Sequence, residues 1–154
     1  MIRRAQADEM DAVRELFREY AEWVGSPICF ASFASEMAEL PGRYSPVLLA
    51  FDAGRLAGCV ALRQIDNGIG EMKRLYVRPA FQGSGLGRSF VERVVEEARA
   101  AGYRALRLDT LPVMQRAIAL YRALGFREIL PYGDNPAEAI CFELELQSQQ
   151  SSPA

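Results

Sequence analysis

The sequence predicts a single mixed α/β domain in which helices flank one layer of β-sheet. The chain has 154 residues, about the size of one ordinary domain, and half of them are hydrophobic while a quarter are charged. The hydrophobic pattern gives a meander of strands, then a strand–helix–strand unit, then a helix and two closing strands. This order is typical of a sheet sandwiched between helices, and no internal repeat or linker divides the chain.

Turn signals and apolar spacing define the first half of the chain. Apolar residues recur every three or four positions from Asp8 until Gly25, which is a natural helix stop. Two apolar runs around Asp52-Ala53-Gly54 indicate a hairpin, and Asp66-Asn67-Gly68 marks the next turn. The expected elements are a strand at 2–4, helices at 8–24 and 33–40, and a meander of strands at 47–51, 56–62 and 71–77.

The second half begins with three alternating glycines, Gly83, Gly85 and Gly87. Helical spacing follows until Gly102, and a later helix is closed by Gly125. The expected elements are helices at 86–101 and 117–124, and strands at 105–108, 126–130 and 140–146. Residues 1–146 thus form one domain, and the polar stretch 147–154 is expected to be a disordered tail.

Composition excludes several kinds of chemistry. Lys and Arg total 18 against 20 Asp and Glu, a net charge of −2, whereas nucleic-acid-binding domains are usually basic. The chain contains no histidine, which removes Ser-His-Asp and Cys-His nucleophile systems and His-ligated zinc. A general base must therefore be Asp, Glu, Tyr, Cys, a water molecule or the substrate itself.

The cysteines and the apolar runs point to a cytoplasmic protein. Cys29, Cys59 and Cys141 form no CxxC pair, and this sparse, odd set fits a reducing compartment. Cys59 and Cys141 lie in apolar runs and are expected to be buried. The N-terminus has no apolar signal core, and no run approaches the ~20 apolar residues of a membrane span. We expect no membrane partner, no nucleic-acid partner and no metal.

The glycine cluster lies between a strand end and a helix start, in LYVRPAFQGSGLGRSF. Unpaired N–H groups at a helix N-terminus suit phosphate, glycines let an anion approach the backbone, and Arg78 and Arg88 flank the loop. A tight turn without a ligand remains the alternative. A Walker loop is excluded because the triplet GK[ST] is absent. A dinucleotide-binding GxGxxG fingerprint is disfavoured because Arg88 occupies its third glycine position, although Asp109 has the ~20-residue spacing of a ribose-binding acid.

Two motifs resemble the GNAT superfamily of N-acetyltransferases. Gln82-x-x-Gly85-x-Gly87 in GEMKRLYVRPAFQGSGLGRSFVE is similar to the acetyl-coenzyme A motif of that family. AIALYRALGFRE is similar to its late motif, in which a helix carrying Leu-Tyr ends at Gly-Phe. The resemblance covers roughly 2–146. It implies a mixed, mostly antiparallel sheet of six to seven strands with about four helices, splayed at a central parallel pair.

The resemblance also implies acetyl-CoA as cosubstrate and direct acetyl transfer to an amine. Backbone N–H groups of the glycine loop would hold the pyrophosphate, with the side chains of Ser84 and Arg88 as helpers. A strand segment would hydrogen-bond the pantetheine arm like an added strand, and a bulge nearby would open the slot. The expected cofactor-binding residues are Leu75, Tyr76, Val77, Gln82, Gly83, Ser84, Gly85, Leu86, Gly87 and Arg88.

Two side chains are expected to move protons. Glu71 lies six residues before Val77, where many relatives place a carboxylate base, often acting through water; the alternative is a structural carboxylate paired with Lys73 or an Arg. Tyr121 matches the tyrosine that the family uses to protonate the departing thiolate, and the alternative is a core aromatic. Met114 stands where many relatives carry an Asn that contacts the cofactor, and the chain departs from the family pattern at this contact.

The acceptor pocket is the least defined part of the expected site. In the family it is built from the first two helices, their loop and the loop between the last two strands. Asp134 either pairs with a cationic acceptor or serves a turn beside Asn135-Pro136. The candidate pocket residues are Tyr20, Trp23, Phe30, Phe33, Tyr44, Tyr132, Asp134 and Asn135.

The expected function is acetyl-CoA-dependent N-acetylation of a primary amine on a small molecule or a protein. The alternative is a non-catalytic acyl-CoA-binding module that regulates a partner, and the presence of both Glu71 and Tyr121 favours the enzyme. The partners expected are acetyl-CoA and an amine acceptor, and a homodimer is left open.

Overall fold

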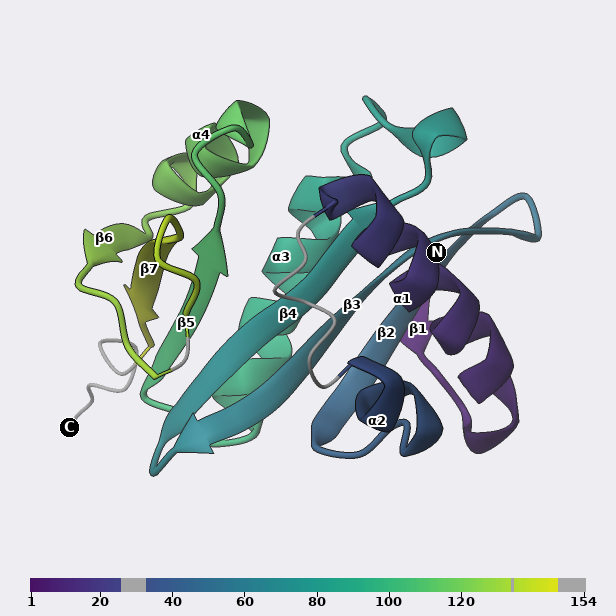
Figure 1. The fold of residues 1–154 in the computed structure, drawn as a ribbon, viewed down its shortest axis with the longest axis horizontal. Helices are drawn as coiled ribbons and strands as arrows, with labels where there is room; N and C mark the ends of the chain where they lie inside the picture. The colour runs from purple at the N-terminus through teal and green to yellow at the C-terminus, as the bar shows by residue number, and fades with distance from the viewer. Residues whose placement is uncertain (26–32, 134, 147–154) are drawn as a thin grey trace, which may run out of the picture.

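A seven-stranded mixed sheet forms the centre of the computed structural model, which describes residues 1–25, 33–133 and 135–146. Its strand order is β1-β2-β3-β4-β5-β7-β6, and among the described strands only β4 and β5 pair in parallel (Figure 1). The strands are β1 (Ile2–Arg4), β2 (Tyr44–Asp52), β3 (Arg55–Asp66), β4 (Ile69–Val77), β5 (Ala105–Thr110), β6 (Arg127–Ile129) and β7 (Ile140–Glu145).

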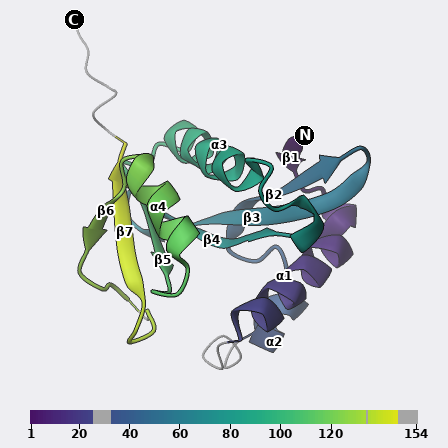
Figure 2. The same ribbon diagram turned by 90° about the horizontal axis from the view of Figure 1, so that it is seen from above.

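Helices cover both faces of this sheet. Helices α1 (Met10–Val24) and α2 (Phe33–Ala38) lie on one face, and α3 (Leu86–Ala100) lies on the other (Figure 2). Helix α4 (Gln115–Ala123) shares the apolar core of α3, because Tyr121 and Phe90 belong to one buried cluster. Short 3-10 turns occupy Ala7–Glu9 and Pro79–Phe81. No helix within the described ranges has the length and apolar content to cross a membrane.

The sheet divides at its parallel pair. Strand β4 pairs with β5 only through Ile69–Glu71 and then continues to Val77 alongside β3 alone. A bulge interrupts the β3–β4 ladder near Arg74, whose φ is 60°. Because a bulge bends a strand and increases its twist, β4 turns away from β5 at this point. The two strands therefore diverge in the middle of the sheet (Figure 1).

The predicted fold class and the order of elements are confirmed. Helix α1 ends at Gly25, whose φ of 67° gives the left-handed cap expected of a helix-stop glycine. The differences are at element ends: α2 stops at Ala38, β2 starts at Tyr44, and β6 covers only Arg127–Ile129. Cys59 and Cys141 are buried as expected. Cys29 and the tail 147–154 lie outside the described residues.

Gly58 supports the region where β4 bends. A Cβ at Gly58 would overlap the backbone oxygen of Tyr76 and would lie 3.2 Å from both Phe90 Cε2 and Val77 Cα. Backbone atoms cannot move aside as a flexible side chain can. Gly58 is therefore required by the close approach of β3 and β4 just beyond the bulge.

We expect Gly58→Ala to lower the free energy of unfolding by about 1–3 kcal/mol, the usual cost of overpacking a core. The matched control is Gly87→Ala, where a Cβ on helix α3 meets nothing within 4 Å. That change should be neutral or stabilising by up to about 1 kcal/mol. Urea unfolding of both variants checks this, and equal stabilities would contradict the steric argument.

Candidate active site

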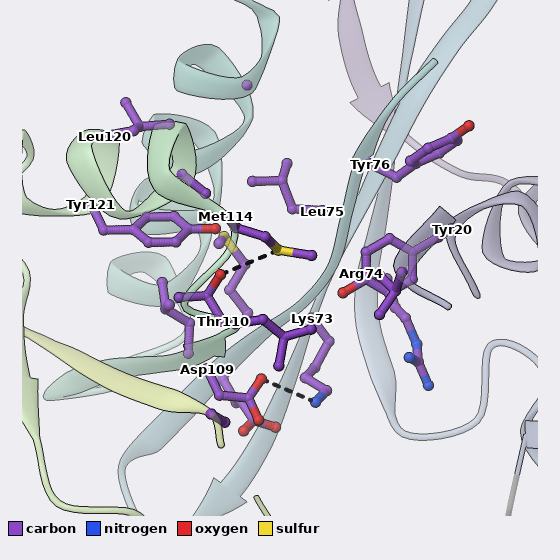
Figure 3. Close-up of a pocket in the computed structure, with 18 of the residues that line it drawn as sticks. Tyr20, Lys73, Arg74, Leu75, Tyr76, Asp109, Thr110, Met114, Leu120 and Tyr121 are labelled. Atoms are coloured by element: carbon purple, nitrogen blue, oxygen red, sulfur yellow. Dashed lines mark hydrogen bonds and ion pairs between the residues drawn. The ribbon is translucent and has the colours of Figure 1, made fainter. Parts of the chain in front are cut away.

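A cavity of about 1490 Å³ occupies the opening between β4 and β5. It reaches from the glycine loop at the start of α3 to the face of the sheet that α1 and α2 cover. Leu75, Met114 and Tyr121 gather on one side of it, while Lys73 and Asp109 face each other nearby (Figure 3). The cavity thus connects the two groups of residues that the sequence predicted for cofactor binding and for proton transfer.

The glycine loop forms the cofactor end of this cavity. Gly83 and Gly85 have φ values of 82° and 86°, a backbone conformation that residues other than glycine rarely adopt. Gly85 is the N-cap of α3, and Leu86, Gly87 and Arg88 form its first turn, whose N–H groups have no partner within the helix. These residues line the cavity, so the loop presents backbone donors and the positive end of the helix dipole to it.

Side chains of the loop brace the loop itself. Gln82 Nε2 donates to Val77 O at 2.9 Å, and Ser84 Oγ donates to Phe81 O at 2.7 Å. Arg88 pairs with Glu92 one turn along α3. An anion at this loop would therefore meet mainly backbone donors, because the Ser84 hydroxyl already donates to Phe81 O.

Arg78, which flanks the glycine loop in the sequence, is paired with acidic residues of α1. Its guanidinium forms ion pairs with Glu15 at 2.6 Å and Glu19 at 2.8 Å, both on α1. Arg78 thus fixes α1 to the end of β4, and its charge is already balanced.

The free edge of β4 forms the wall between the two ends of the cavity. Leu75 points into the cavity, whereas Tyr76 points to the opposite side of the strand (Figure 3). There Tyr76 packs against Tyr20 and Trp23, with ring centroids 6.3 and 6.1 Å away. Because β5 has diverged, this edge of β4 is not paired with β5 beyond Glu71, although Val77 O already accepts a hydrogen bond from Gln82 Nε2. The rest of the edge offers a place where an extended ligand can pair as a strand would.

Glu71 is the last residue of β4 that pairs with β5, and it is only 2% exposed. Its Oε1 accepts a hydrogen bond from Arg63 Nε at 2.9 Å and is 2.8 Å from Arg63 Nη2. Its Oε2 accepts a hydrogen bond from the Tyr132 hydroxyl at 2.7 Å. Glu71 is thus a buried, fully hydrogen-bonded carboxylate that also lines the cavity.

The alternative considered for Glu71 is an ion pair with Lys73 or an Arg, and the structure shows this pair with Arg63. Lys73 instead faces Asp109, with Nζ 3.7 Å from Oδ1. Asp109 also accepts a hydrogen bond from Asn135 Nδ2 at 2.8 Å. Glu71, Lys73 and Asp109 therefore bring both signs of charge to the same end of the cavity.

Tyr121 lies on α4 and is 4% exposed. Its ring packs against Phe126 and Phe142 at centroid distances of 5.8 and 6.0 Å, so the core role considered for it is real. Its hydroxyl nevertheless points towards Met114 at the cavity wall (Figure 3). Burial raises the pKa of Tyr121, which keeps the phenol protonated and available as a donor.

Met114 stands at the N-cap of α4 and lines the cavity beside Tyr121. Its sulfur accepts a hydrogen bond from Thr110 Oγ1 at 3.4 Å. A thioether offers a weak acceptor and no donor, so the polar contact that an Asn would give to a ligand is replaced by an apolar one.

The predicted acceptor residues are only partly brought together. The cavity is lined by Tyr20, Trp23, Tyr44, Tyr132 and Asn135. Phe33 instead lies beneath Arg74, whose guanidinium is 5.8 Å from the ring centroid. Phe30 and Asp134 lie outside the described residues.

The family profile described as acetyltransferase (GNAT) matches residues 10–126. The chain belongs to this family. It is 34% identical to an uncharacterised N-acetyltransferase of Schizosaccharomyces pombe, over 87% of this chain and 86% of that one. It is 35% identical to the IAA acetyltransferase of Azospirillum brasilense, over 80% and 82% of the two chains.

Solved acetyltransferase structures share the fold. A GNAT-family acetyltransferase from Staphylococcus aureus Mu50 superposes with a TM-score of 0.79 at 16% identity, covering 95% of this chain and 98% of that one. The Salmonella typhimurium acetyltransferase yncA, solved with acetyl-CoA, gives a TM-score of 0.74 at 23% identity, covering 100% of this chain and 97% of that one. The splayed sheet of this acetyltransferase is therefore an arrangement that distant proteins also adopt.

Sequence reasoning missed Arg63 and Arg107 at this acetyltransferase site. Arg63 binds Glu71. The Arg107 guanidinium lies 5.2 Å from the centroid of the Tyr132 ring, and its Nε donates to Glu143. The alternation of strands offered a signal, because Arg63 follows buried Cys59 and Ala61 on one face of β3. Among the described residues, no cluster of three or more Cys, Asp or Glu side chains is arranged to hold a metal.

We expect Tyr121→Phe to reduce turnover about 10²-fold or more while lowering thermal stability little, because the change removes a donor and keeps the packed ring. Tyr103→Phe, outside the cavity, is the matched control for loss of a phenol hydroxyl. Steady-state kinetics and a melting curve on each variant check the result. Full turnover with a lowered melting temperature would leave Tyr121 a core residue only.

Proposed function

We propose that this acetyltransferase transfers an acetyl group from acetyl-CoA to a primary amine of a small molecule or protein, by direct attack in a ternary complex. The observation that carries the proposal is the single cavity that joins the glycine loop of α3 to the buried Glu71 through the gap between β4 and β5. A transfer without a covalent enzyme intermediate needs both substrates in one continuous space, and this cavity supplies it.

The cofactor would enter from the α3 side. Its pyrophosphate suits the backbone donors of Gly83 to Arg88, and its pantetheine arm suits the open edge of β4 at Leu75–Val77. Laid along this path, the thioester reaches the region of Met114 and Tyr121. Tyr121, which its raised pKa keeps protonated, is the proposed hydrogen-bond donor to the departing thiolate, which needs little more because a thiol has an ordinary pKa of ~8.5.

The acceptor would enter from the side that α1 and α2 cover. Glu71 is the proposed base for its nitrogen, because the chain has no histidine and Glu71 is the carboxylate at the point where the strands part. Its two hydrogen-bond partners favour indirect proton transfer over direct contact with the amine. The relatives named for IAA acetyltransferase and for amino-acid acetyltransferase support a small-molecule acceptor.

The test is a turnover screen in which release of the CoA thiol is measured with polyamines, amino acids and peptides as acceptors. Acetylation of one amine class, verified by mass spectrometry, is the expected result. Tight acetyl-CoA binding with no turnover on any acceptor would instead favour a regulatory acyl-CoA-binding module.

We expect Gly85→Glu to weaken acetyl-CoA binding at least tenfold, or ~1.4 kcal/mol, because it places a carboxylate where the pyrophosphate should lie. Gly102→Glu is the control: Gly102 also has a positive φ, 85°, but lies beyond the opposite end of α3. Calorimetry on both folded variants measures the difference. Equal affinities would remove the glycine loop from cofactor binding.

We expect Glu71→Gln to lower turnover and to change the acidic side of the pH–rate profile, where a carboxylate base becomes protonated, with little effect on acetyl-CoA binding. Glu128→Gln is the control, since Glu128 is exposed and pairs with Arg122 outside the cavity. Kinetics across pH provide the measurement. A Glu71→Gln enzyme with the parental rate and profile would make Glu71 a structural carboxylate.

A further inference from the structure

Both oxygens of Glu71 already have a hydrogen-bond partner. Arg63 occupies Oε1 through two nitrogens, and the Tyr132 hydroxyl occupies Oε2 at 2.7 Å. The side chain is almost fully buried. An amine that reached Glu71 directly would therefore share the carboxylate with these partners.

Tyr132 lies beside Glu71 at the cavity wall. It lines the cavity, and its hydroxyl donates its proton to Glu71. A phenol oxygen also has lone pairs, and no second hydrogen bond to this oxygen exists within the described residues. The Tyr132 oxygen therefore keeps acceptor capacity at the cavity wall, one hydrogen bond away from the buried carboxylate.

The loop that carries Tyr132 is fixed to β5. Asn135 Oδ1 accepts a hydrogen bond from the Tyr132 backbone N–H at 2.7 Å, and Asn135 Nδ2 donates to Asp109 Oδ2 at 2.8 Å. The guanidinium of Arg107 lies over the Tyr132 ring at 5.2 Å. Three separate contacts thus hold the phenol in place, which is what a proton-transfer group requires.

We propose that Tyr132 relays the proton from the acceptor nitrogen to Glu71. This inference rests on the proposed function and adds the step that joins the amine to the base. As the C–N bond forms, the nitrogen becomes cationic and its N–H acidic, and the C–S bond of the thioester breaks with its electron pair leaving on the CoA thiolate. That proton passes to the Tyr132 oxygen while the Tyr132 proton passes to Glu71 Oε2. Glu71 ends as a carboxylic acid, Tyr132 is regenerated as a phenol, and no electrons are gained or lost.

The environment of Tyr132 suits a relay rather than a base. Burial, followed by the charge of Glu71, raises the pKa of Tyr132, so the group stays a phenol and does not ionise to a phenolate base. A phenol that both accepts and donates in one step avoids forming phenolate. The charged and titratable groups that surround the pair are Arg63 on β3, Lys73 on β4, Arg107 and Asp109 on β5, and Cys141 on β7.

The test compares Tyr132→Phe, Glu71→Gln and the double variant in steady-state assays across pH, with the amine identified by the turnover screen. We expect Tyr132→Phe to lower kcat at least tenfold and to alter the acidic side of the pH profile as Glu71→Gln does, with the KM for acetyl-CoA unchanged. Because the two groups act in series, the double variant should be no slower than the slower single variant.

Several outcomes would overturn the relay. A Tyr132→Phe enzyme with the parental kcat would do so, as would a double variant in which the kcat reductions of the two single variants multiply. A Tyr132→Phe variant that changes only the KM for the acceptor would also do so. Tyr103→Phe controls for loss of a hydroxyl elsewhere. If Tyr132→Phe does not fold, Glu71→Asp serves instead, since the shortened carboxylate should lose contact with Tyr132 and lower kcat likewise. A wild-type enzyme without turnover on any amine would refute the proposed function, and the relay with it.

Discussion

The parting of β4 and β5 after three paired residues is the constraint on which the whole site depends. If the pairing continued beyond Glu71, the gap would close, the edge of β4 would be used by β5, and Leu75 and Tyr121 would pack together. The bulge at Arg74 prevents this, and the side chain of Arg74 holds the bulge. Its guanidinium binds Glu36 of α2 through Nε at 3.1 Å and Nη2 at 2.7 Å.

This ion pair is partly buried, with the side chains of Arg74 and Glu36 10% and 20% exposed. Burial alone would lower the pKa of Arg74, but the hydrogen bonds to Glu36 raise it above the ordinary value, so Arg74 stays charged. Tyr44 also donates to Glu36, at 2.9 Å, which joins β2 to the same cluster. Removing either partner would leave the other charge partly buried without its counter-ion, which destabilises the fold. Helix α2 and the opening in the sheet are therefore stabilised together.

The sequence predicted the parts of the site that depend on local backbone conformation. Gly83 and Gly85 have the positive φ values expected of an anion-binding turn, and the helix that follows begins where expected. The cluster around Glu71 could not be predicted in the same way. Arg63, Glu71 and Tyr132 meet because of strand register and the path of a loop between β6 and β7, and neither is encoded in local periodicity. Tyr132 was expected near the acceptor, but its bond to Glu71 was not.

The two ends of the cavity consequently differ in what determines their ligand. The cofactor end presents backbone donors, which any phosphate can use. The acceptor end presents side chains from separate strands and a loop, with Glu71 and Asp109 balanced by Arg63 and Lys73. Because each of these carboxylates is already paired with a cation, this end of the cavity carries little net charge. For the amine acceptor that we propose, recognition here would therefore depend on the positions of individual side chains rather than on net electrostatic attraction.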